Sequence, residues 1–224
     1  MDIGGCEGAN PMAEEMRTEP LEKPAKTALP GKMTYEEFLA WADEDTWAEW
    51  VNGEVIILTP AALRHQQLAT FLATSINFFV DAHQFGVVLT APFQMKIGPD
   101  LPGREPDILF IAREHLDRLR DTYLEGPADL VVEIISRDSR ARDRGEKFYE
   151  YEQGGVREYW LLDYLRRQAE FYQLGSDGIY HLVPVGVDGI YRSAVLEGLW
   201  LKVEWLWQEP LPPLLTVLRE WGLV

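Results

Sequence analysis

Apolar residues recur along the chain at spacings that predict several helices. Thr34 and Glu37 stand three residues apart, the spacing of a capping box, so we expect a helix to begin beside them and to bury Phe38. Ser139 is a suitable N-cap for a later helix, which Gly154-Gly155 would end. The predicted helices cover residues 33–41, 61–82, 139–153 and 213–221.

Short apolar runs between these helices predict strands. Asn52-Gly53 joins two such runs and is typical of a two-residue hairpin turn. The predicted strands cover residues 49–51, 54–58, 87–90, 93–97, 107–111, 130–135 and 158–163, followed by an antiparallel meander over 169–174, 179–185, 194–195 and 199–206. This mixture predicts an α/β fold, with a mixed central sheet flanked by helices and antiparallel C-terminal strands. Residues 99–106 are predicted to form a loop.

The composition is that of an ordinary globular domain. Of the 224 residues, 46% are hydrophobic and 26% are charged. Residues 1–32 mix Gly, Pro, Glu and Lys with few large apolar side chains, so we expect a flexible extension before a single domain spanning 33–224. Cys6 is the only cysteine, no apolar run is long enough to span a bilayer, and residues 1–10 do not resemble a signal peptide. We therefore expect a cytoplasmic protein without a membrane partner.

The net charge of −16 argues against a protein that grips nucleic acid along its whole surface. Such binding depends on Lys and Arg side chains that neutralise phosphates. An acidic chain would need a local basic segment or bound metal ions instead. The basic segment in this sequence contains Arg137, Arg140, Arg142, Arg144 and Lys147, although neighbouring carboxylates dilute it. A solvated, ion-paired helix face explains this segment nearly as well.

Two carboxylates stand out because of their apolar surroundings. Asp107 opens an apolar strand directly after Pro106, and Glu133 interrupts another. A buried charge is costly unless it is paired or bound to a cation. On adjacent strands the two side chains could share a divalent metal such as Mg²⁺, which prefers oxygen ligands. The alternative is a structural ion pair between Glu133 and Lys147 or an arginine.

Several motifs together resemble those of a known family. Residues 33–206 are similar to the Uma family of restriction-endonuclease-like proteins, a branch of the PD-(D/E)XK nuclease superfamily. The segments that carry the resemblance are residues 49–54 (EWVNGE), Pro106-Asp107, residues 132–136 (VEIIS), and residues 142–147 (RDRGEK) leading through Tyr151 and Gly155-Val156 to Glu158-Tyr159-Trp160. The resemblance implies a restriction-endonuclease-like fold.

The resemblance also implies roles for particular residues. Asp107 and Glu133 would bind the metal, Mg²⁺ or Mn²⁺, and the backbone carbonyl of Ile134 would complete the protein ligands. Glu49 would support this metal site. His65 matches a histidine of the family's long helix, which we interpret as structural or solvent-exposed rather than functional.

The lysine of the superfamily is expected at a displaced position. Its usual place, two residues after the glutamate, is occupied by Ile135, and Lys147 on the following helix matches instead. Asp143, Lys147 and Tyr151 recur every four residues, so they would share one helix face. Gly145 beside them would allow close packing against the sheet. Lys147 would then position the attacking water and stabilise charge on the phosphate.

These inferences predict a metal-dependent endonuclease that hydrolyses nucleic-acid phosphodiester bonds, with DNA as the expected substrate. A homodimer is expected, with the apolar C-terminal strands as its interface. Two alternatives remain open at this point. The chain could be a binding or assembly module that retains the fold without catalysis, or a metal-dependent hydrolase of a small phosphorylated molecule.

Overall fold

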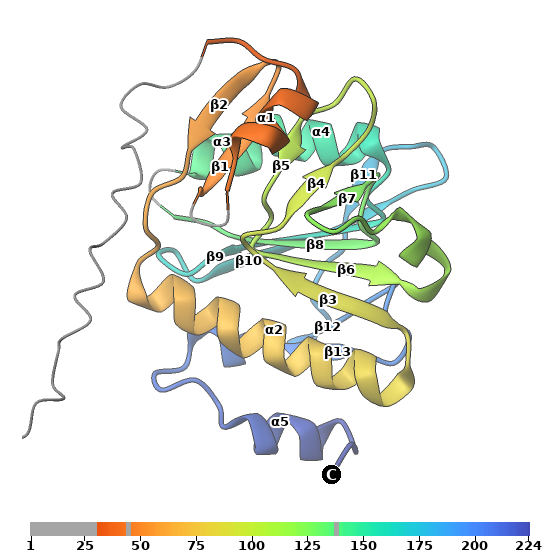
Figure 1. Cartoon of the computed structure of the whole chain (residues 1–224). Helices are drawn as coiled ribbons and strands as arrows, with labels where there is room; N and C mark the ends of the chain where they lie inside the picture. Colours follow the sequence, from red (N-terminus) through yellow and green to blue (C-terminus); the bar gives the residue numbers. More distant parts are fainter. Residues whose placement is uncertain (1–30, 44–45, 137–138) are drawn as a thin grey trace, which may run out of the picture. The chain divides into compact units, whose positions relative to one another are not determined.

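A six-stranded sheet lies at the centre of the domain (Figure 1). In the order β11-β10-β9-β8-β6-β3, it contains β3 (Gly86–Thr90), β6 (Ile108–Ala112), β8 (Leu130–Ile134), β9 (Glu158–Asp163), β10 (Gln168–Leu174) and β11 (Tyr180–Leu182). β8 and β9 are parallel and the other neighbours are antiparallel, which confirms the predicted mixed sheet. The structure is a computed structural model that describes residues 31–43, 46–136 and 139–224. Almost all of the predicted extension, and Arg137 of the basic segment, lie outside these residues.

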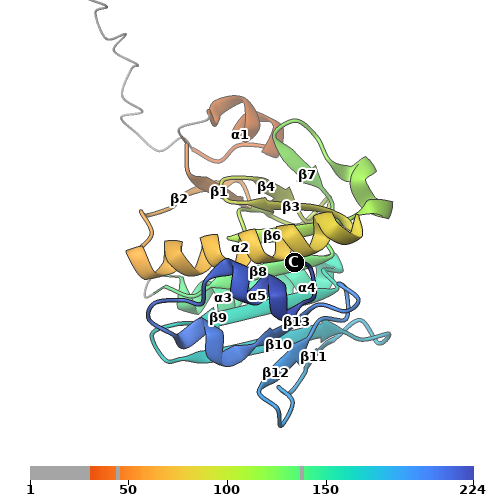
Figure 2. The ribbon, with the colours of Figure 1, turned by 90° about the horizontal axis from the view of Figure 1, so that it is seen from below.

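Helix α2 (Leu63–His83) covers one face of this sheet (Figure 2). Side chains of a strand alternate between its two faces, so every second residue of β6 and β8 meets the helix. The buried core between them includes Leu68, Leu72, Ile76, Ile108, Phe110, Leu130 and Val132. Burial of each such side chain contributes about 1.5–3 kcal/mol to stability. This packing fixes the start of α2 beside the end of β8.

A second sheet and helix α4 (Glu146–Gly154) cover the opposite face. In the order β2-β1-β5-β4-β7, the second sheet contains β1 (Ala48–Val51), β2 (Glu54–Ile57), β4 (Gln94–Lys96), β5 (Gly103–Arg104) and β7 (Tyr123–Glu125). Its Met95 and Leu124 pack with Leu109 and Val131 of the central sheet. Because both faces are covered, β6 and β8 are apolar on both sides, which explains their continuous hydrophobic sequences.

The N-terminal part of the domain follows the sequence pattern closely. Helix α1 (Tyr35–Trp41) begins with the predicted capping box, in which Thr34 and Glu37 bond to each other's backbone N–H groups. β1 and β2 form the predicted hairpin, with Asn52 at φ 51° and Gly53 at φ 89°. Positive φ at both central residues is what a type I′ turn requires.

The pairing of β6 with β8 places the two prominent carboxylates together. Leu109 pairs with Val131 and Ile108 with Val132 in an antiparallel register. Continued by one residue, this register sets Asp107 opposite Glu133, on the same face of the sheet. That face is the one covered by α4, so both side chains point toward the helix.

The helix predicted over 139–153 is instead two helices, and this prediction was wrong. α3 (Arg140–Arg144) and α4 are separated at Gly145, which has φ −115° and ψ −93°. A Cβ atom at Gly145 would lie 2.7 Å from the carbonyl oxygen of Ala141, so the missing side chain permits this bend rather than packing against the sheet. The predicted end of the helix is confirmed, because Gly155 caps α4 in the left-handed conformation.

The C-terminal region keeps its antiparallel strands but differs in detail. β12 (Ile190–Arg192) and β13 (Trp200–Lys202) form a separate two-stranded sheet. The strand predicted at 194–195 is absent, and η2 (Val203–Trp207) is a 3₁₀ helix where the last strand was extended too far. A second 3₁₀ helix, η1 (Arg113–Arg118), and α5 (Leu214–Glu220) complete the elements. In the described part of the chain, no helix has the length and hydropathy needed to cross a membrane.

A buried carboxylate explains why residues 193–195 form a turn. Glu158 is 0% exposed, and its side chain accepts five hydrogen bonds. The donors are Trp160 Nε1, Tyr191 Oη, Ser193 Oγ and the backbone N–H groups of Ala194 and Val195. The backbone N–H groups that would enter a strand ladder therefore bind the central sheet through Glu158.

We expect Glu158→Ala to lower the free energy of unfolding by about 3 kcal/mol or more, since it leaves several buried donors without an acceptor. Urea denaturation measures this change. Glu197→Ala removes an exposed glutamate from the same region and is expected to change the value by less than about 0.5 kcal/mol. Equal effects of the two substitutions would show that the Glu158 network does not hold this turn.

Candidate active site

A cleft of about 720 Å³ opens where Asp107 and Glu133 lie, between the start of α2, the β1–β2 hairpin and the helix pair α3–α4. The residues predicted from the sequence to form the site all line it: Glu49, Asp107, Glu133, Ile134 and Lys147. Other charged side chains in its lining belong to Arg64, Glu105, Arg142 and Asp143. Segments far apart in the sequence thus converge on one acidic cleft.

Asp107 is fixed at the edge of this cleft by two contacts. Its Oδ2 accepts a hydrogen bond from the backbone N–H of Ile134, at 2.6 Å, and lies 3.2 Å from Nε2 of His65. The side chain is 19% exposed, and within the described residues its Oδ1 accepts no hydrogen bond. One oxygen therefore holds the carboxylate in place and the other is left for a ligand.

Glu133 lies deeper and is held through one oxygen only. Its Oε1 accepts hydrogen bonds from Nζ of Lys147, at 2.8 Å, and from Oη of Tyr151, at 2.7 Å. Burial raises the pKa of Glu133 to about 8, and the charges of Asp143 and Asp107 add to this effect, although Lys147 opposes it. Among the described residues, no donor reaches Oε2.

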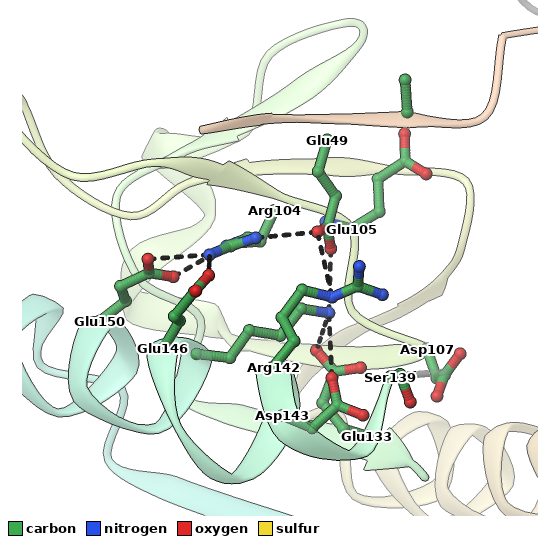
Figure 3. A network of polar contacts seen from close by, with 12 residues as sticks. Glu49, Arg104, Glu105, Asp107, Glu133, Ser139, Arg142, Asp143, Glu146 and Glu150 are labelled. Carbon is green, nitrogen blue, oxygen red and sulfur yellow. Dashed lines mark hydrogen bonds and ion pairs between the residues drawn. The ribbon is translucent and has the colours of Figure 1, made fainter. Parts of the chain in front are cut away.

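Lys147 joins the carboxylates of the site, of which Figure 3 labels Glu49, Glu133 and Asp143. Its Nζ lies 2.8 Å from Glu133, 2.9 Å from Glu49 and 3.7 Å from Asp143, and the side chain is 3% exposed. Burial lowers the pKa of Lys147, but Glu133 and Glu49 raise it more strongly, so the amine is charged. Asp143, Lys147 and Tyr151 do meet in the site, but not on one helix face as predicted: Asp143 comes from α3, and Lys147 and Tyr151 come from α4.

A fully buried arginine, which sequence reasoning missed, anchors the other side of the site. Arg104 donates to Glu49 at 3.0 Å and to both oxygens of Glu150 at 2.8 Å, and lies 3.5 Å from Glu146 (Figure 3). It belongs to β5, inside the segment predicted to be a loop. Glu146 and Glu150 stand four residues apart, so on a helix their carboxylates lie side by side and favour a cation between them. This spacing is the sequence signal by which a partner such as Arg104 could have been expected.

Glu105 is a further acidic residue of the cleft. Its Oε1 accepts a hydrogen bond from Nε2 of Gln94 at 2.7 Å, and the residue is 7% exposed. Burial raises the pKa of Glu105 to about 7, and the neighbouring charge of Glu49 raises it further, against the effects of Gln94 and Lys147. The cleft thus contains more carboxyl groups than its cations neutralise.

His65 has a closer connection to the site than its interpretation as structural implied. It lies in the first turns of α2, is 8% exposed, and contacts Asp107. Burial lowers the pKa of His65, but the hydrogen bond to Asp107 and the charge of that carboxylate raise it more, so its pKa is above the usual value. The contact orients Asp107, as residues behind a metal ligand commonly do.

The oxygen atoms available as ligands in the cleft suit a hard divalent cation, both in chemical type and in number. Asp107 and Glu133 each have one carboxylate oxygen free, and the backbone of Ile134 lies beside them. No group of three or more His, Cys, Asp and Glu side chains is arranged to hold a metal within the part of the chain that the structure describes. Mg²⁺ does not need such a cage, since it binds through one or two carboxylates and keeps several waters.

The fold and the cleft together define an α/β protein of the restriction-endonuclease-like class. The chain belongs to the Uma2 family, described as putative restriction endonuclease, whose model matches residues 35–204. It is also similar to a solved structure described as a putative nuclease belonging to DUF820 from Anabaena variabilis. That likeness has a TM-score of 0.64 at 17% identity and covers 78% of this chain and 97% of the other. No curated protein matches the chain.

The identity of 17% to the solved structure shows the fold and not the activity. The family match supports a nuclease-like function in general terms, and it confirms the resemblance that the motifs indicated. The particular reaction and the roles of the residues rest on the chemistry of the cleft.

We expect Glu49 to make folding depend on pH. Burial raises its pKa, but Lys147 and Arg104 lower it more, to about 2 in the folded chain from 4.5. The resulting stability, about 3 kcal/mol, is fully present above pH 4.5 and is lost as the pH falls through 2. Chemical denaturation at several pH values should show the difference between wild type and Glu49→Gln shrinking over this range. A difference that stays constant from pH 5 to pH 2.5 would contradict this assignment.

Proposed function

We propose that this protein is a Mg²⁺-dependent endonuclease, able to use Mn²⁺, that hydrolyses phosphodiester bonds of nucleic acid, with DNA as its substrate. One observation carries the proposal. Asp107 and Glu133 face each other across adjacent strands, each with a free oxygen in the cleft, and Lys147 lies among the buried carboxylates. The second oxygens of Asp107 and Glu133 are not used by these contacts and are available as ligands.

Each residue has a role that follows from its position. Asp107, Glu133 and the backbone carbonyl of Ile134 would hold the metal, which when bound supplies a Lewis acid and lowers the pKa of a coordinated water. Glu49 fixes the ammonium of Lys147 beside Glu133. That ammonium provides positive charge where negative charge builds on the phosphate.

The acidic cleft favours hydrolysis with a bound cation over a binding role without one. Burial raises the pKa of Glu133 and of Asp143, and the nearby negative charge of Asp107 raises both further, although Lys147 lowers them. A divalent cation would relieve this repulsion. A module that had lost catalysis would have no need to retain this acidic cleft.

A homodimer and a cytoplasmic location are also part of this proposal. Analytical sedimentation would test whether the protein is a dimer.

We expect Mg²⁺ or Mn²⁺ to support cleavage of plasmid and oligonucleotide DNA by the wild-type protein. Asp107→Asn and Lys147→Met should each lower the rate at least about 100-fold, because one removes a metal ligand and the other a charge beside the phosphate. Gel electrophoresis of the products measures the rate. Glu125→Gln and Lys202→Met, matched substitutions outside the cleft, should retain full activity.

Full activity in Lys147→Met, with the protein folded, would show that the lysine has no catalytic role. Absence of cleavage by the wild type with either metal and any DNA would remove the endonuclease proposal. Hydrolysis of small phosphate esters under the same conditions would then favour the hydrolase alternative.

Metal binding can be tested apart from activity. We expect Mn²⁺ to raise the unfolding temperature of the wild type, because a ligand that binds only the folded chain stabilises it. Asp107→Asn should abolish most of this increase, whereas Asp117→Asn, which changes an aspartate outside the cleft, should preserve it. Differential scanning calorimetry with and without Mn²⁺ gives both values. The same increase in both variants would place the metal elsewhere.

A further inference from the structure

The lining of the cleft includes exposed apolar side chains from two separate elements. Trp47, beside β1, is 43% exposed, and Leu165, in the turn between β9 and β10, is 44% exposed. Both line the cleft. Tyr164 precedes Leu165 in the same lining and is partly buried. The acidic residues suited to a metal are therefore bordered by apolar side chains, which a charged phosphate backbone alone would not contact favourably.

Two unpaired cations follow directly in the same turn. Arg166 and Arg167 are exposed, and neither guanidinium forms a hydrogen bond or ion pair with any described residue. Most other arginines of this acidic chain are bound to carboxylates or to backbone carbonyls, for example Arg140 to Asp163 and Arg64 to Leu206. The β9–β10 turn thus offers free positive charge next in sequence to Leu165 of the cleft lining, although neither arginine lines the cleft itself.

A third cation is available within the cleft. Arg142 is 25% exposed, and its nearest acidic partner is Glu49, at 3.8 Å from Nε (Figure 3). At this distance the contact is an ion pair without a hydrogen bond; Nε itself is buried, but the guanidinium is partly exposed and donates no hydrogen bond to a described residue. Arg142 can therefore donate to a phosphate that reaches the acidic residues.

These features fit an unpaired nucleic-acid strand better than a duplex. In a duplex the bases are stacked inside, and the protein meets mainly phosphates, whose binding requires many cations. In a single strand the bases are open, and each can stack on an aromatic side chain while few cations follow the backbone. An acidic chain with an exposed tryptophan and Arg142 in its cleft, and with Arg166 and Arg167 in the adjoining turn, has the second set of groups.

We infer that the substrate of this cleft is a nucleic-acid strand with unpaired bases, held by stacking on Trp47 against Leu165 and by phosphate contacts to Arg142, Arg166 and Arg167. This inference rests on the proposed function and specifies its substrate class. The strand enters past the β9–β10 turn and brings one phosphate to Asp107. Bases on either side of that phosphate lie against Trp47 and Leu165.

Fluorescence anisotropy with labelled oligonucleotides tests the inference, with Ca²⁺ replacing Mg²⁺ so that binding is measured without relying on cleavage. A DNA single strand, an RNA single strand of the same sequence and a blunt DNA hairpin, whose two strands are joined by a non-nucleotide linker so that every base is paired, are compared. We expect the wild type to bind at least one single strand about tenfold more tightly than the hairpin. Comparison of the DNA strand with the RNA strand shows which of the two nucleic acids the cleft binds more tightly.

Substitutions at these residues should weaken single-strand binding selectively. Trp47→Ala is expected to lower affinity about tenfold and Trp47→Phe to restore most of it, because the ring supplies the stacking surface. Arg166→Gln with Arg167→Gln should lower affinity and reduce the slope of log affinity against log salt by about 1 to 2. Leu182→Ala and Arg219→Gln, at exposed residues outside the cleft, are the matched controls.

Three results would overturn the inference. Tighter binding or faster cleavage of the hairpin would do so while leaving the endonuclease proposal intact. Unchanged single-strand affinity in both the Trp47→Ala and the double arginine variant would place the strand on another surface, again without affecting that proposal. Absence of binding to all three oligonucleotides would remove both the inference and the nucleic-acid substrate.

Discussion

The ammonium of Lys147 is the contact on which the arrangement of the domain depends. It lies within 3 Å of Glu133 in the central sheet and of Glu49 in the second sheet, and it belongs to the helix that covers both. Three separate elements therefore meet at one buried charge. A buried ammonium is stable only when carboxylates surround it, and buried carboxylates require a cation in return. This mutual requirement fixes the relative position of the sheets and α4.

Arg104 completes this arrangement from the outer side of Glu49. It binds Glu49 together with Glu150 of α4, so Glu49 is held by cations from two directions. The carboxyl groups that remain on the cleft side, at Glu133 and Glu105, have raised pKa values, chiefly because they are buried. The fold thus satisfies the charges that join its layers and leaves acidic groups in the cleft, where a divalent cation or a substrate can meet them.

The sequence predicted those features that depend on local patterns. Asn52-Gly53 determined the hairpin, and the apolar strands on either side of Asp107 and Glu133 allowed the two carboxylates to be placed together. Arg104 could not be found in this way, because its partners are 42 to 55 residues distant in the chain. The bend at Gly145 escaped detection because the helical spacing of Asp143, Lys147 and Tyr151 continues across it. Contacts between layers, such as that of His65 with Asp107, are set by packing that no local pattern encodes.

The ion pairs of the domain bear on how a chain with a net charge of −16 can bind nucleic acid. Many basic side chains are occupied within the domain, as Arg104 and Lys147 are, so these cations are not available to bind phosphates at the surface. Long-range attraction of a polyanion is then weak, and a substrate must be recognised by short-range contacts at the cleft itself. Stacking and a metal-bound phosphate are contacts of this kind. Because bulk attraction contributes little, the few unpaired cations near the cleft have a larger share in selecting the substrate than they would in a basic protein.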